Sequence, residues 1–204
     1  MTEQKTRIKI CGLRRMEDIE AVNRYQPDYA GFICSSRFWR FISKDTLTGL
    51  RHSLKDNIRS VGVFVDEPVD YIADYVRHDL IDMVQLHGHE PQSYIQELQK
   101  EIRVPVIKAF KIESEEDIEA ARQSIADYVL LDNGAGTGQT FDWSLIRDIG
   151  RPFFLAGGLN ENNAVSAVEK FQPYAVDISG GVETDRRKDP EKIRRVIRLI
   201  RSCQ

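Results

Sequence analysis

Short apolar runs alternate with amphipathic helical stretches along the whole chain of 204 residues. Most positions in these runs are apolar, which is typical of parallel strands covered by helices on both faces of a sheet. The runs begin at Arg7, Tyr29, Ser60, Met83, Pro105, Tyr128, Pro152 and Tyr174. Eight strand–helix pairs of about 25 residues each are the number that closes a parallel barrel. The pattern therefore predicts an α/β protein, a single (β/α)8 TIM barrel.

The helical stretches carry their own end signals. Ser114 and Asp117 match an N-cap and a first-turn acid, and Pro190 directly follows Asp189 as a first-turn proline. A doubly wound open sheet is the structural alternative, but it would show a nucleotide-type glycine turn after the first strand. The first run ends in CGL instead. We therefore expect one domain over residues 1–204.

Composition narrows the possible functions. The formal net charge is -3, with no basic block or acidic tail, so nothing indicates a nucleic-acid partner. No apolar run approaches the roughly 20 residues that cross a bilayer, and the charged start lacks the apolar core of a signal peptide. The three cysteines show no CxxC spacing, which argues against a disulfide framework or a structural zinc site. We expect a cytoplasmic globular protein without a membrane partner.

Active sites of (β/α)8 barrels lie at the carboxyl ends of the strands, so the polar residues there are the candidates. The seventh and eighth runs both close on consecutive glycines, which let backbone amides approach an anion closely. A tight turn would explain one such pair, but two on adjacent strands favour a site for a sugar phosphate. The strand ends carry Cys11, Ser35 to Arg40, Asp66, His87, Lys111, Asp132, Gly157-Gly158 and Ser179-Gly180-Gly181.

Cys11 and Asp132 are the candidates for proton transfer. A cysteine in a strand is more often a small core residue than a reactive group, and Asp132 would equally suit a cap or a turn. However, these residues end the first and sixth strands, so they could face each other across the barrel mouth. A thiolate base opposite a carboxylic acid suits proton abstraction from a sugar carbon together with protonation of an oxygen.

Two further groups of residues are less specific. Arg37 and Arg40, in SSRFWRFIS, would either pair with a planar anionic ligand or lie in a solvated loop on the rim. His87 and His89 lie two residues apart, but no further ligand has a suitable spacing, so we expect no metal site. The run GAGTG from Gly134 lacks the ending of a P-loop and fits a mobile active-site loop.

Seven motifs, in order, resemble those of one known family, the phosphoribosylanthranilate isomerases of tryptophan biosynthesis. They are KICGL from Lys9, GVFVD from Gly62, VQLHG from Val84, LLD from Leu130, GTGQTFDW from Gly136, LAGGLN from Leu155 and VDISGGVE from Val176. The departures are small. Many relatives have Ser-Ser-Gly where this chain has the run from Ser179, others carry a lysine in place of Gln139, and the common Ser-Pro-Arg after the second strand is missing.

The resemblance implies an Amadori rearrangement of N-(5'-phosphoribosyl)anthranilate to 1-(2-carboxyphenylamino)-1-deoxyribulose 5-phosphate, without metal or cofactor. It implies that Asp132 protonates the ring oxygen and that Cys11 removes the proton on C2'. Arg40 would bind the anthranilate moiety, His87 would be a further substrate contact, and the two glycine loops would hold the phosphate. For this chemistry the site should help Cys11 to form a thiolate, while Asp132 must arrive protonated.

Two other functions are weighed against this one. The barrel isomerase of histidine biosynthesis catalyses the same rearrangement, but that family resembles a two-halved repeat with an aspartate where this chain has Cys11. A non-catalytic barrel that binds a sugar phosphate would be expected to have lost the base or the acid. We expect a monomer, with a dimer as the alternative, and a separate indole-glycerol-phosphate synthase is a candidate partner.

Overall fold

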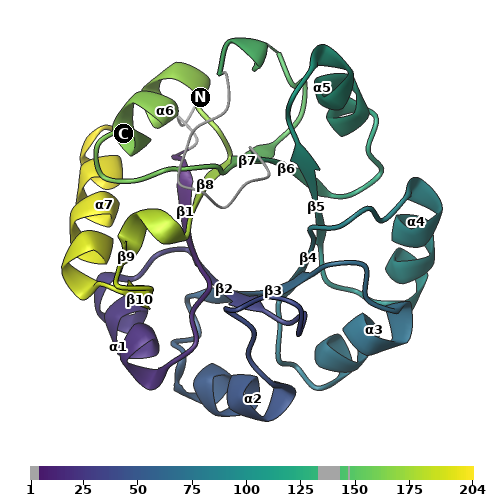
Figure 1. Ribbon diagram of the computed structural model, residues 1–204, viewed down its shortest axis with the longest axis horizontal. Helices are drawn as coiled ribbons and strands as arrows, with labels where there is room; N and C mark the ends of the chain where they lie inside the picture. The colour runs from purple at the N-terminus through teal and green to yellow at the C-terminus, as the bar shows by residue number, and fades with distance from the viewer. Residues whose placement is uncertain (1–4, 133–142, 147) are drawn as a thin grey trace.

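The computed structural model describes residues 5–132, 143–146 and 148–204. Eight parallel strands close into a barrel in sequence order, and Figure 1 shows them as a central ring surrounded by helices. The strands are β1 (Arg7–Cys11), β2 (Tyr29–Ile33), β3 (Arg59–Phe64), β4 (Met83–Leu86), β5 (Val106–Lys111), β6 (Tyr128–Asp132), β7 (Phe153–Leu155) and β8 (Ala175–Ile178). β1 closes the ring against β8, with Lys9 opposite Asp177. The predicted (β/α)8 barrel is confirmed.

Helices follow the strands on the outside of the ring. The α-helices are α1 (Met16–Tyr25), α2 (Lys44–Ser53), α3 (Val69–Arg77), α4 (Gln92–Glu101), α5 (Glu115–Arg122), α6 (Ala164–Phe171) and α7 (Pro190–Ser202). After β6 the described residues form only a 3-10 helix, η1 (Trp143–Leu145), and the glycine-rich run predicted from Gly134 lies outside the described residues. After β8 come a second 3-10 helix, η2 (Gly180–Val182), and a hairpin of β9 (Glu183–Thr184) and β10 (Arg187–Lys188).

The predicted helix ends are found where the sequence placed them. Ser114 and Asp117 form a capping box at the start of α5, in which each side chain meets the backbone of the other residue. Asp189 is the N-cap of α7, and its side chain accepts hydrogen bonds from the backbone N–H groups of Glu191 and Lys192. Pro190 is the first residue of the helix. Within the described ranges, no helix is both long enough and apolar enough to span a membrane.

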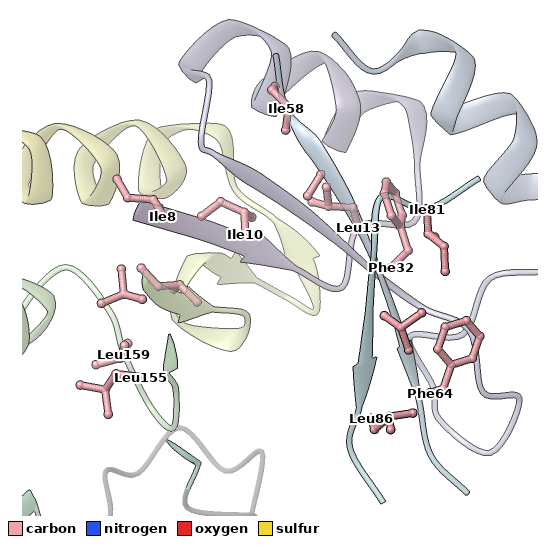
Figure 2. Packing of buried hydrophobic residues seen from close by; sticks show 14 of the residues in the cluster. Ile8, Ile10, Leu13, Phe32, Ile58, Phe64, Ile81, Leu86, Leu155 and Leu159 are labelled. Atoms are coloured by element: carbon pink, nitrogen blue, oxygen red, sulfur yellow. The ribbon is translucent and has the colours of Figure 1, made fainter. Parts of the chain in front are cut away.

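Apolar side chains form two separate cores. The larger core lies between the sheet and the helices, and Figure 2 shows Ile8 and Ile10 side by side on one face of β1 as part of it. The smaller core fills the inside of the barrel and includes Phe154 of β7, whose two neighbours in the strand belong to the outer core. This alternation follows from the period of two along a strand, so successive residues face the helices and the barrel interior in turn.

Three tyrosines close the amino-terminal end of the barrel. The hydroxyl group of Tyr174 lies 3.1 Å from that of Tyr29 and 3.2 Å from that of Tyr128. The guanidinium group of Arg7 stacks on the Tyr174 ring at 4.3 Å from its centroid. A packed aromatic layer therefore fills this end, and a ligand cavity has room only toward the other end of the strands.

Candidate active site

A cavity of about 490 Å³ opens at the carboxyl ends of the barrel strands. Its volume lies within the range that holds small organic ligands. The residues that the sequence proposed for catalysis and substrate binding all line this one cavity: Cys11, Arg40, His87, Asp132, Gly157, Gly158, Ser179, Gly180 and Gly181. The strand-end rule has thus brought together residues that lie up to 170 positions apart in the sequence.

The loops after β7 and β8 form one continuous backbone surface at the side of the cavity. Gly157 and Gly158 have positive φ angles of 86° and 68°, which turn the chain in a way that side chains disfavour. Gly181 packs so closely that a Cβ atom there would lie 1.9 Å from the carbonyl oxygen of Leu159. Bare backbone therefore faces the cavity on both loops, as a cradle for a phosphate requires.

Cys11 ends β1 with its thiol in the cavity wall and only 6% of the residue exposed. The neighbouring strand leaves room for the sulfur, because a Cβ atom on Gly31 would lie 2.7 Å from Sγ. Burial raises the pKa of Cys11, and the positive charge of Lys9 lowers it, with the rise prevailing. The expected help toward a thiolate thus comes from Lys9, but burial outweighs it.

Lys9 lies beneath Cys11 inside the barrel and is fully buried. Its Nζ donates to Asp177 Oδ2 at 2.7 Å and to Gln85 Oε1 at 2.8 Å. Burial alone would lower the pKa of Lys9, but the charges of Asp177 and Cys11 raise it overall, so the ammonium stays protonated. In the described part of the chain, the second oxygen of Asp177 is buried without a hydrogen-bond partner, and Asp177 lines the cavity.

Asp132 ends β6 and meets His87 from the end of β4. His87 Nε2 lies 3.2 Å from Asp132 Oδ2, and His87 Nδ1 lies 2.8 Å from Nε2, the side-chain amide nitrogen, of Gln85. All three side chains line the cavity. The carboxyl group of Asp132, the candidate acid, therefore contacts the His87 imidazole, which in turn contacts the side-chain amide of Gln85.

Arg40 reaches the cavity from the loop after β2 and is held by Glu183. Nε and Nη2 of Arg40 donate to the two carboxylate oxygens of Glu183 at 2.9 and 2.8 Å, and Lys188 Nζ donates to the same carboxylate at 2.8 Å. Burial alone would raise the pKa of Glu183, but the hydrogen bond from Arg40 and the charge of Lys188 lower it overall. The guanidinium also stacks on Trp39, at 4.1 Å from the ring centroid. A flat cation is thus fixed at the rim.

Other candidates at the strand ends, among them Arg37, Asp66 and Lys111, lie outside the cavity lining. Arg37 donates to the carbonyl oxygen of Val65 and lies 4.0 Å from an oxygen of Asp66, so Arg40 is the arginine of the site by position. Lys111 forms an exposed ion pair with Glu113.

His89 has a different partner from that of His87, which contacts Asp132. Its imidazole is 97% exposed and bonds Asp66. Among residues 5–132, 143–146 and 148–204, no three His, Cys, Asp or Glu side chains are placed to hold a metal ion.

The sequence analysis missed Lys9, Gln85 and Asp177. Each stands two positions before a residue that it did nominate, namely Cys11, His87 and Ser179. Because side chains two apart on a strand share a face, this spacing was the signal that could have placed them inside the barrel.

Comparison with known proteins agrees with this geometry. Residues 8–198 match the family model of N-(5'-phosphoribosyl)anthranilate isomerase. The N-(5'-phosphoribosyl)anthranilate isomerase of Endomicrobium trichonymphae is 44% identical, over 96% of this chain and 98% of its own. The crystal structure of the phosphoribosylanthranilate isomerase of Thermotoga maritima is similar with a TM-score of 0.87 and 35% identity, over 97% of this chain and 99% of that one.

A further solved structure contains a ligand. It is a phosphoribosylanthranilate isomerase in complex with reduced 1-(o-carboxyphenylamino)-1-deoxyribulose 5-phosphate. Its TM-score is 0.85 at 35% identity, and the match covers 97% of this chain and 99% of that one. By its sequence and its fold, the chain belongs to the N-(5'-phosphoribosyl)anthranilate isomerase family.

Proposed function

We propose that this chain isomerises N-(5'-phosphoribosyl)anthranilate to 1-(2-carboxyphenylamino)-1-deoxyribulose 5-phosphate, with Asp132 as the acid and Cys11 as the base. The observation that carries the proposal is that both side chains and both glycine loops line one cavity. A phosphate bound to the loops would hold the sugar between a thiol on one side of the barrel and a carboxyl group on the other. The proposal treats residues 1–204 as one isomerase domain.

The reaction needs one proton delivered and one removed. Asp132 gives its proton to the ring oxygen, the bond between this oxygen and C1' breaks, and the nitrogen lone pair forms a Schiff base. The Cys11 thiolate then takes the proton from C2', and the electrons of that bond form an enolamine that tautomerises to the ketone. A positively charged nitrogen at C1' makes the C2' proton more acidic, so a thiolate is a sufficient base.

Substrate binding divides between the two ends of the ligand. Backbone amides of the glycine loops suit the phosphate. Arg40 and Lys188 both donate to Glu183, and their two positive charges exceed its single negative charge, which leaves a positive edge for the anthranilate carboxylate. Glu183 uses only Nε and Nη2 of Arg40, and a guanidinium has five N–H donors, so others remain for the ligand. His87 is placed to contact the ligand beside Asp132.

We also infer a cytoplasmic enzyme that acts as a monomer on a small phosphorylated substrate, with indole-glycerol-phosphate synthase as a candidate partner. The large hydrophobic side chains that are exposed in the described ranges are scattered over several elements: Met16, Phe38, Trp39, Tyr71, Ile125 and Leu199. Such scatter is ordinary for a protein surface and supports a monomer over a dimer. Sedimentation of the purified chain, alone and with the synthase, tests both statements.

Turnover of freshly made substrate, followed by anthranilate fluorescence, tests the function. Replacing an acid or base usually costs about 100- to 10,000-fold in rate, so Cys11→Ser and Asp132→Asn should lose nearly all activity. Cys34→Ser and Asp66→Asn are the matched controls, because these residues lie at strand ends but outside the cavity lining. A wild type that binds product analogues without turnover would favour the non-catalytic barrel, and an active Cys11→Ser or Asp132→Asn would remove that residue from its role.

A further inference from the structure

A line of hydrogen bonds crosses the barrel interior from β1 to β6. Lys9 Nζ lies 2.8 Å from Gln85 Oε1, the amide nitrogen of Gln85 lies 2.8 Å from His87 Nδ1, and His87 Nε2 lies 3.2 Å from Asp132 Oδ2. Lys9 and Gln85 are almost completely buried, so solvent cannot replace the inner part of this line.

The chemistry of the groups fixes the direction of every bond in the line. An ammonium has only donors, so the oxygen of the Gln85 amide must face Lys9. The NH2 group of Gln85 then faces His87 Nδ1, and because NH2 can only donate, Nδ1 must accept. A neutral imidazole whose Nδ1 accepts carries its proton on Nε2, which is the nitrogen that faces Asp132.

The reverse arrangement is excluded by the same bonds. A proton on His87 Nδ1 would place two donors against each other at 2.8 Å, with the Gln85 amide unable to turn because Lys9 holds its oxygen. Asp177 keeps Lys9 charged through its contact at 2.7 Å, so the anchor of the line is itself fixed. On β6, Asp132 is the carboxylate that faces Nε2 of His87, at 3.2 Å.

We propose that Gln85 is a positioning residue that locks His87 in the tautomer with its proton on Nε2, and so aims a permanent donor at one oxygen of Asp132. This inference rests on the proposed function, in which Asp132 is the acid. The donor stabilises the carboxylate that remains after Asp132 has given up its proton.

The tautomer can be read by 15N NMR of protein labelled at histidine, with the signals of His87 assigned through a His87→Asn variant. Wild type should show a protonated Nε2 and a bare Nδ1. Gln85→Glu places a second acceptor against Nδ1, so Nδ1 should become protonated in that variant. Gln85→Met removes the donor without adding an acceptor, so the two tautomers should become mixed.

Kinetics complete the test. Loss of one oriented hydrogen bond should lower kcat by about fivefold to tenfold in Gln85→Met, and more in Gln85→Glu, while KM changes less. Gln96→Glu on the exposed side of α4 is the control for an added charge and should keep wild-type kcat. Wild-type measurements remain decisive even if a variant does not fold.

Different outcomes separate this inference from the proposed function. An active wild type with the His87 proton on Nδ1 would overturn the inference alone, as would a Gln85→Glu variant with a protonated Nδ1 and full kcat. A wild type that carries the expected tautomer but never turns over substrate would overturn the proposed function.

Discussion

Replacing Lys9 by methionine removes the cation that contacts Asp177 inside the barrel. The ammonium is fully buried and lies 2.7 Å from Asp177 Oδ2, and Asp177 is only 9% exposed. Breaking a buried ion pair from one side leaves an uncompensated charge and costs about 3–5 kcal/mol. In a chain of this length, such a loss lowers the midpoint of thermal unfolding by on the order of 10 °C.

A second substitution separates lost charge from lost packing. Lys9→Met combined with Asp177→Asn removes the stranded carboxylate, so most of the free energy of unfolding lost in the single variant should return. Urea unfolding followed by circular dichroism gives both values. A single variant that loses less than about 1 kcal/mol, which is an ordinary effect of any substitution, would refute the reasoning. So would a double variant no more stable than the single one.

The pH dependence of activity should also change in the same two variants. Lys9 lowers the pKa of Cys11, so its removal should raise this pKa further and reduce the thiolate population tenfold for each pKa unit. The rising limb of kcat/KM against pH should therefore move to higher pH in Lys9→Met. In the double variant the shift should be smaller, because Asp177 raises the pKa of Cys11 and its charge is gone as well. An unmoved limb in both variants would show that Lys9 does not act on the base.

Three further substitutions test the cavity. Gly31→Ala would place a methyl group 2.7 Å from the sulfur of Cys11. We therefore expect kcat to fall about 10- to 100-fold in steady-state kinetics. An unchanged kcat would contradict the tight placement of the base. Gly181→Ala would place a carbon 1.9 Å from the Leu159 carbonyl oxygen, so the two glycine loops must move apart. KM and the Kd for inorganic phosphate should then rise about tenfold. Unchanged values would place the phosphate elsewhere. Because the pKa of Glu183 lies below its ordinary value of 4.5, its contribution to stability is complete above that pH and is lost as the pH falls through the lowered pKa. Glu183→Gln should therefore destabilise the protein at pH 7 and flatten the decline in stability on the acid side, and parallel curves for both proteins would refute this.

The barrel and the location of its site were readable from the sequence because both follow from local rules. Eight apolar runs with helical stretches between them allow few arrangements, and parallel strands bring all their carboxyl ends to one side. Cys11, Asp132 and the paired glycines stand at those ends, so their meeting in one cavity needed no knowledge of distant contacts.

The remaining parts of the site depend on partners far away in the chain. Arg40 rather than Arg37 faces the cavity because Glu183, 143 positions later, holds its guanidinium. The charge on Lys9 is stabilised because β8 brings Asp177 beside β1. No local pattern gives such pairings, since they arise only when the barrel closes.

The three tyrosines whose hydroxyl groups meet at the amino-terminal end of the barrel also govern how molecules exchange. With that end filled by Tyr29, Tyr128 and Tyr174, the described part of the chain leaves the mouth beside Cys11 as the route both in and out. Product must vacate the cavity before another substrate can enter. Accumulated product should therefore act as a purely competitive inhibitor, and net flux through the enzyme will depend on how fast the next reaction consumes that product.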